Sequence, residues 1–204
     1  MLTRYRHAVR WPLHRLPRPL RIAVDWLATL GIAAAIVLVL EAEVAKPYRI
    51  PSASMEPTLH CAAPAPGCFG KSSDRVVAAK IVYDFRNPER GDVVVFNAPA
   101  AAKAQCQEGG TFVKRIIGLP GDVVSERRGF VYIDGRRLIE PYVDPRLRDH
   151  MTRTWPRVSA HQYFVMGDNR AASCDSRQWG TVPRGSLIGP VVGLYWPFAR
   201  IGFR

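Results

Sequence analysis

Residues 50–59 read Ile50-Pro-Ser-Ala-Ser-Met-Glu-Pro-Thr-Leu59 and place two serines, Ser52 and Ser54, between two prolines. Proline fixes its own φ and biases the residue before it towards extended geometry. We therefore expect a strand to end at Ile50 and a rigid turn to follow. A serine on a rigid turn can be aimed at a substrate, as a nucleophile must be. Ser-x-Ser beside proline is also common in ordinary turns, so this interpretation depends on a proton acceptor elsewhere in the chain.

The chain before this stretch has a basic end and a long apolar run. Residues 1–21 contain six arginines and no acidic residue, and residues 22–40 (IAVDWLATLGIAAAIVLVL) contain a single charge, Asp25. The run would span about 28 Å as a helix, close to the ~30 Å core of a bilayer. A cleaved signal peptide and a buried core helix are the alternatives, but the run is long for the first and not amphipathic for the second. We predict a cytoplasmic tail at 1–21 and a transmembrane anchor at 22–40, which places residues 41–204 outside the cell membrane.

The segment 41–204 consists of short β-like runs separated by turns. Strands are predicted where β-branched and aromatic residues gather, at 44–50, 75–79, 81–85, 92–97, 111–119, 162–166 and 187–196. The sequence FVYIDGRRLI at 130–139 predicts a hairpin with a type I′ turn at Asp-Gly. Residues 141–157 are rich in proline and charge and are expected to form a surface excursion. These features together predict one mainly β domain.

The apolar segment 189–198 is short and contains two prolines, so it is not a second membrane span. A core strand is the simpler interpretation, and an apolar rim resting on the bilayer is the alternative. The net charge of +12 comes from 29 Lys and Arg against 17 Asp and Glu. This charge is scattered and accompanies no nucleic-acid-binding motif, so we expect no nucleic-acid partner.

A nucleophilic serine needs a base, and the five histidines offer none in a recognisable setting with an acid. Lys114 is the better candidate because it interrupts the apolar run TFVKRIIGL at 111–119. Burial disfavours a charged amine and can lower a lysine pKa by ~2–4 units from about 10.4, which would let the neutral amine accept a proton. The alternatives are a Lys-Arg pair on the solvent face of an edge strand, or Lys80 as the base.

A third constellation is MGDNRAASCDSR at 166–177. Gly-Asp-Asn favours tight turns, and Ser173 adds a short hydroxyl. Asp175 and Arg177 are spaced to pair with each other or with the backbone of the turn. Alone, this pattern indicates only a hydrogen-bonded loop.

Taken in order, these motifs and Arg90-Gly-Asp-Val-Val-Val-Phe closely resemble those of bacterial type I signal peptidases, over roughly residues 20–200. The resemblance implies an antiparallel-sheet catalytic domain behind a single membrane anchor. It implies that Ser54 is the nucleophile and Lys114 the general base of an acyl-enzyme mechanism. Ser52 and the backbone N–H of Ser54 would bind the oxyanion, Ser173 would orient the lysine, and Asp175 with Arg177 would form a supporting salt bridge.

The same resemblance implies a substrate: secreted preproteins, bound as an added strand and cut after a small residue. Six positions correspond to the substrate pocket, namely Tyr48, Ile50, Met55, Leu59, Phe112 and Val113. The expected partners are signal peptides, the lipid bilayer of the cell membrane and a secretion translocon. No cofactor is expected.

Residues 60–73 depart from the family pattern as an inserted, proline-rich loop. The four cysteines lie on the external side, where disulfides persist, and they allow three pairings. We expect Cys61–Cys68 as a local link. The second bridge, Cys106–Cys174, would join the approach to the Lys114 strand to the loop that carries Ser173. Zinc is the alternative, but no C-x-x-C pair or histidine cluster supports a metal site.

Two other classes of function remain open. One is an enzyme with the same dyad, such as a self-cleaving repressor or a conjugation-pilin peptidase. The other is an envelope binding module that has kept the fold without the activity. The signal anchor argues against a repressor, and the complete set of Ser52, Ser54, Lys114 and Ser173 argues against an inactive module.

Overall fold

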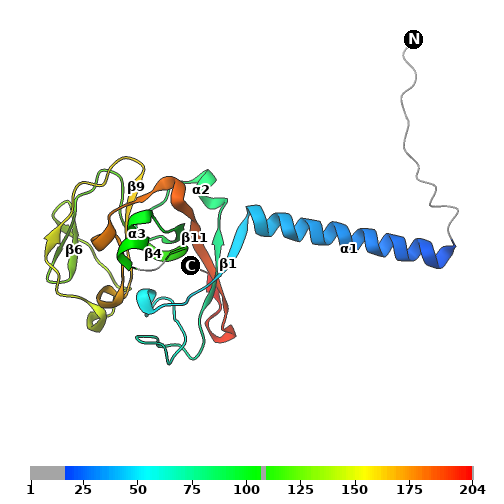
Figure 1. Ribbon diagram of the computed structural model, residues 1–204, viewed down its shortest axis with the longest axis horizontal. Coiled ribbons are helices and arrows are strands. Elements are labelled where there is room, and N and C mark those ends of the chain that lie inside the picture. Colours follow the sequence, from blue (N-terminus) through cyan, green and yellow to red (C-terminus); the bar gives the residue numbers. More distant parts are fainter. Residues whose placement is uncertain (1–16, 107–108, 204) are drawn as a thin grey trace, which may run out of the picture. The chain divides into compact units, whose positions relative to one another are not determined.

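The computed structural model describes residues 17–106 and 109–203 (Figure 1). The chain divides into two compact units, Met1–Ala42 and Glu43–Arg204. The described part of the first unit is residues 17–42, nearly all of them in the helix α1 (Arg18–Glu43). Its segment Arg18–Leu38 has a mean hydropathy of 1.8, and among the described residues it is the one helix long and apolar enough to cross a membrane. Most of the predicted tail at 1–21 lies outside the described residues.

The second unit is built on two antiparallel sheets. The larger has the order β1-β2-β11-β3-β4-β9-β10, with β12 paired to β11, and the smaller has the order β7-β6-β5-β8. The larger sheet contains β1 (Ala45–Arg49), β2 (Arg75–Ala79), β3 (Val93–Asn97), β4 (Thr111–Gly118), β9 (Gln162–Met166), β10 (Val182–Pro183), β11 (Leu187–Trp196) and β12 (Gly202–Phe203). The smaller contains β5 (Val124–Arg127), β6 (Phe130–Ile133), β7 (Arg136–Arg137) and β8 (Arg153–Thr154). The prediction of a mainly β, antiparallel fold after one apolar helix is confirmed.

Short helical segments connect these strands. The α-helical ones are α2 (Val82–Phe85), α3 (Ala100–Cys106) and α4 (Ser176–Trp179). The 3₁₀ turns are η2 (Ala53–Met55), η3 (Pro145–Leu147), η4 (Arg170–Ala172), η5 (Arg184–Ser186) and η6 (Phe198–Arg200). Three of these helical segments, η2, η4 and α4, carry or adjoin the candidate catalytic, orienting and supporting residues.

Strand β3 lies near the middle of the larger sheet, and both of its faces are buried. Val95 packs in a cluster with Met55, while Val94 and Phe96 pack in a second cluster with Ile116. Burial on both faces explains why β3 reads as an uninterrupted apolar run rather than an alternating one. The strand β4 beside it is exposed at Thr111 and becomes buried from Lys114, the candidate base, onwards.

The smaller sheet covers a third cluster, which includes Val131, Trp155 and Phe164. Its β6–β7 hairpin turns at Asp134 and Gly135, whose φ angles are 48° and 80°. Positive φ at both central residues is the type I′ geometry that the Asp-Gly pair predicts. Segment 141–157 contributes more to the interior than its composition indicates, since it supplies β8 and the buried Trp155.

The prediction of a strand at residues 81–85 is wrong. These residues form a single helical turn, α2, whose Tyr83 is buried and donates its hydroxyl to Asp92, while Phe85 is 83% exposed. An apolar run of four or five residues fits a helical turn as well as a strand, because each offers one buried face.

Candidate active site

Ser54 lies on the 3₁₀ turn η2, directly after β1 and the extended residues that follow it. Ser52 is the N-cap of this turn, in the extended geometry typical of an N-cap residue (φ −129°, ψ 159°). The side chain of Ser54 is only 8% exposed. Its carbonyl oxygen accepts the backbone N–H of Asn169 at 3.1 Å, which fixes the turn against the loop after β9.

Lys114 reaches this turn from β4, 60 positions further along the chain, and is 5% exposed. Its Nζ donates to Ser54 Oγ at 2.6 Å. The aromatic ring of Phe112 lies beside the amine, 5.6 Å from Nζ to the ring centroid. The two residues belong to motifs far apart in the chain, and the fold brings their side chains into contact, as the sequence motifs predict.

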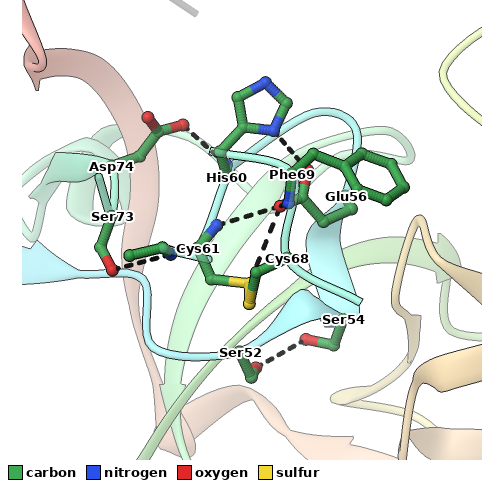
Figure 2. Close-up of a disulfide and its surroundings, with 10 residues drawn as sticks. Ser52, Ser54, Glu56, His60, Cys61, Cys68, Phe69, Ser73 and Asp74 are labelled. Atoms are coloured by element: carbon green, nitrogen blue, oxygen red, sulfur yellow. Dashed lines mark hydrogen bonds and ion pairs between the residues drawn. A yellow bond between two sulfur atoms is a disulfide. The ribbon is translucent and has the colours of Figure 1, made fainter. Parts of the chain in front are cut away.

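Two more serines surround the pair. Ser52 Oγ lies 3.3 Å from Ser54 Oγ, close enough for a hydrogen bond (Figure 2). Ser173 is buried, and its Oγ packs against Gly167. A Cβ at Gly167 would lie 2.3 Å from Ser173 Oγ and 2.4 Å from the carbonyl oxygen of Ser54, so only glycine fits there.

The loop 167–177 is held by a buried arginine–carboxylate pair. Asp175 accepts Arg177 Nε at 2.8 Å and Nη2 at 2.9 Å, and it also accepts the backbone N–H of Gly167 at 3.0 Å. Burial alone would raise the pKa of Asp175, but the charge of Arg177 and these hydrogen bonds outweigh burial and hold that pKa below its usual value. The carboxylate therefore stays ionised and keeps the loop closed on Gly167.

A second buried pair joins three segments and is not predicted from the sequence. Arg115 donates to both oxygens of Asp168, at 2.8 and 2.6 Å, and Thr58 Oγ1 donates to the same carboxylate at 2.5 Å. These residues come from the Lys114 strand, the loop after β9 and the Ser54 stretch. The only signal in the sequence is the position of Arg115 beside Lys114, for which a Lys-Arg pair on the solvent face of an edge strand is one of the alternatives. Arg115 is instead buried.

Ser52, Ser54 and Lys114 line a cleft of about 520 Å³, within the size range of ligand sites, whereas Ser173 is not among its lining residues. Five of the six predicted pocket residues also line it, namely Tyr48, Ile50, Met55, Phe112 and Val113. Leu59 is not among the lining residues. It is fully buried in the core with Met55, because the turn after Pro57 directs it inwards. Among the described residues, no group of three His, Cys, Asp or Glu side chains could hold a metal ion.

Two disulfides flank the site, and they join the pairs expected from the sequence. Cys61–Cys68 closes a separation of 7 residues within the inserted loop, and Cys106–Cys174 closes a separation of 68. Cys106 and Cys174 line the cleft. The second bridge therefore forms part of the cleft wall and links α3 to the residue next to Ser173.

Comparison with known proteins decides the family. The family model described as "Signal peptidase, peptidase S26" matches residues 23–196. The chain belongs to the signal peptidase family. The probable signal peptidase I-2 of Synechocystis sp. is 43% identical over 160 residues, which is 78% of this chain and 66% of that protein.

Other signal peptidases match over more of their length. The probable signal peptidase I-1 of Synechocystis sp. is 36% identical over 92% of this chain and 89% of its own. The signal peptidase I of Leptolyngbya laminosa is 37% identical over 88% of this chain and 82% of its own. The chain is thus an enzyme of the signal peptidase family, a serine endopeptidase. In its cleft, Ser54 is the serine that contacts a buried amine.

Proposed function

We propose that this protein is a membrane-anchored endopeptidase that removes N-terminal signal peptides from secreted preproteins, with Ser54 as nucleophile and Lys114 as general base. The observation that carries the proposal is the 2.6 Å contact between Lys114 Nζ and Ser54 Oγ in the wall of a cleft. Membership of the signal peptidase family supplies the class of reaction.

The first step needs a neutral amine. Lys114 is almost fully buried, and loss of hydration favours the uncharged form. The neutral Nζ accepts the hydroxyl proton of Ser54 while Oγ attacks the scissile carbonyl carbon, and the carbonyl π electrons move to its oxygen. Because Nζ already lies in contact with Oγ, no rearrangement of the two side chains is required.

The negative oxygen of the tetrahedral intermediate needs donors. The hydroxyl of Ser52, 3.3 Å from Ser54 Oγ, and the backbone N–H of Ser54 are the proposed pair. Each such donor contributes about 3 kcal/mol to stabilisation of the transition state. Collapse of the intermediate breaks the peptide C–N bond, and protonated Lys114 gives its proton to the leaving amine.

The remaining ester on Ser54 is hydrolysed by water. Lys114, neutral again, takes a proton from the water, which attacks the acyl carbon and releases Ser54 with its proton restored. Ser173 is buried in the loop held by Asp175 and Arg177, and we assign to it the orientation of the lysine amine. These assignments use only groups that the fold gathers around the cleft.

The cleft also supports a preference for small residues. Apolar side chains line it next to Ser54, including Ile50, Met55 and Val113, and we assign to them the exclusion of bulky residues. Tyr48 and Arg49 of β1 belong to the lining, so an extended peptide can lie along this strand as an added strand. The preprotein would then present its scissile bond to Ser54.

The helix α1 supports the membrane location. Six arginines lie before the apolar run, and Glu41 and Glu43 lie directly after it, which favours a cytoplasmic N-terminus and an external catalytic domain. That topology brings the cleft to the side of the membrane on which signal peptides emerge, and a secretion translocon is the partner that would deliver them. The lipid bilayer holds the anchor.

The proposal is tested with the full-length chain in lipid vesicles and a purified preprotein. Wild type is expected to release a mature protein whose new N-terminus follows a small residue, as measured by N-terminal sequencing. Ser54→Ala should lose at least about 10³-fold in kcat because the nucleophile is absent. Lys71→Ala, a change at an exposed lysine in the inserted loop, is the control and should cleave at the wild-type rate. A wild type that leaves the preprotein intact, or a Ser54→Ala variant that cleaves normally, would contradict the proposal.

A further inference from the structure

Glu56 lies two residues after Ser54, and its carboxylate is fully buried, at 0% exposure. One oxygen, Oε1, accepts the backbone N–H groups of Cys61 at 3.1 Å and Phe69 at 3.0 Å (Figure 2). The other oxygen, Oε2, contacts Nδ1 of His60. Because Phe69 directly follows Cys68, this single carboxylate holds the inserted loop at both ends of its disulfide.

The base of the same loop is held by a second carboxylate. Asp74 Oδ2 accepts the backbone N–H of His60 at 2.8 Å, and the N–H of Asp74 donates to the carbonyl oxygen of His60 at 2.8 Å. The carbonyl oxygen of Asp74 accepts the N–H of Ile50 at 2.9 Å. Arg200 contacts the carboxylate of Asp74 at 3.2 Å. The loop is therefore fixed to the chain just before the Ser54 turn as well as just after it.

The tip of the loop touches the turn itself. A Cβ placed on Gly67 would lie 3.1 Å from the Cβ of Ala53, the residue directly before Ser54. The backbone N–H of Glu56 donates to the carbonyl oxygen of Ala53 at 3.1 Å. Glu56 thus contacts η2 through its backbone and supports the same turn through its side chain and the loop.

A buried carboxylate is costly to the fold unless its partners compensate, and an apolar residue could fill the same space. Burial raises the pKa of Glu56, while the N–H groups of Phe69 and Cys61 and the charge of Arg200 lower it in part. The charged and titratable groups that face this carboxylate are His60 and Arg200. Two backbone N–H groups and the His60 ring converge on this buried carboxylate, which indicates that it fixes geometry.

We infer that Glu56 is a positioning residue: by closing the disulfide loop 60–73 against Ala53, it sets the direction in which Ser54 Oγ points towards Lys114. This inference rests on the proposed function, because it concerns the rate of the reaction assigned to that pair. The loop belongs to the active site without touching the substrate. Its contribution should appear in kcat, since the residues that line the cleft are unchanged.

The test uses the full-length chain in lipid vesicles with a preprotein substrate, and it measures kcat, KM and thermal unfolding for each variant. Glu56→Ala removes the acceptor and should lower kcat by about 10- to 100-fold, with little change in KM, because a misplacement near 1 Å has effects of that size. Glu56→Gln keeps Oε1 as acceptor and presents an N–H group to His60, so it should stay within about threefold of wild type. The double variant C61S/C68S opens the loop without altering Glu56 and should lower kcat by about tenfold.

Lys71→Ala is the matched control, because this exposed side chain lies in the same loop and should leave kcat unchanged. The inference is overturned if folded Glu56→Ala keeps kcat within twofold of wild type, or if Glu56→Gln is as slow as Glu56→Ala. If Glu56→Ala does not fold, the double variant C61S/C68S takes its place in the test. The inference is then overturned if folded C61S/C68S keeps kcat within twofold of wild type. Ser54→Ala in the same assay separates the two claims: cleavage that depends on Ser54 but not on Glu56 rejects the inference alone, whereas a wild type without activity rejects the proposed function.

Discussion

Two loops hold the serine and lysine together, and they use buried carboxylates differently. The loop 167–177 is held by ion pairs, of which Asp175 with Arg177 is the nearest to Ser173. The loop 60–73 is held mainly by carboxylates that accept backbone N–H groups, as Glu56 does. An ion pair fixes one side chain against another, whereas a carboxylate on N–H groups fixes the backbone. The difference indicates that the Ser54 turn is positioned mainly through backbone N–H groups, whereas the Ser173 loop combines an ion pair with contacts of that kind, such as Gly167 N–H to Asp175.

Removal of a disulfide is the change with the largest expected effect on either loop. Cys106–Cys174 closes a loop of 68 residues and Cys61–Cys68 one of 7, so chain entropy predicts stabilisation of about 4 and about 2.5 kcal/mol, respectively. C106S/C174S should therefore lower the free energy of unfolding more than C61S/C68S does, as measured by denaturant titration of the full chain. The losses of kcat in the two double variants should differ less than their losses of stability, because the shorter loop supports the nucleophile. Equal losses of stability would contradict the entropic account.

A smaller effect should come from Glu126, a buried carboxylate on the side of Arg177. Burial, together with the negative charge of Asp149, raises the pKa of Glu126 to about 7, although Arg177 and Arg170 lower it. The folded protein therefore keeps a proton on Glu126 up to about pH 7, while the unfolded chain releases it near pH 4.5. The contribution of Glu126 to the free energy of unfolding is therefore fully present below pH 4.5 and is lost as the pH rises towards 7.

Glu126→Gln should remove this dependence. We expect the difference in unfolding free energy between pH 4.5 and pH 7.5 to shrink by about 1–2 kcal/mol, after allowance for solvent screening. Glu89→Gln is the control, because Glu89 lies on a surface turn with its side chain 72% exposed, and it should keep the wild-type dependence. If Glu126→Gln and wild type respond identically to pH, Glu126 is not the group that titrates.

The sequence predicts the central pair because its signals are local. Ser54 lies between two prolines, and Lys114 interrupts an apolar strand, so each is visible without knowledge of the fold. The pairing of Asp175 with Arg177 is also expected, since the two are adjacent on one turn. The alternation of β-branched runs and turns is enough to predict a mainly β domain.

What the sequence does not reveal depends on long-range packing. Glu56 in a proline turn looks like an ordinary exposed glutamate, and only the fold shows that it is buried under the inserted loop. Arg115 looks like the solvent-facing half of a Lys-Arg pair until the loop after β9 brings Asp168 beside it. Leu59 fits an apolar pocket or an apolar core equally well in the sequence, and the direction of the turn places it in the core.

The central claim is that a buried lysine, rather than a histidine, activates the nucleophile. The most direct measurement is the single-turnover rate of preprotein cleavage by full-length Lys114→Ala in lipid vesicles, with thermal unfolding recorded in parallel. Because the variant lacks the group that accepts the Ser54 proton, the rate should fall by at least about 10³-fold while the protein remains folded. A folded Lys114→Ala that cleaves at more than about one tenth of the wild-type rate would show that another group serves as the base.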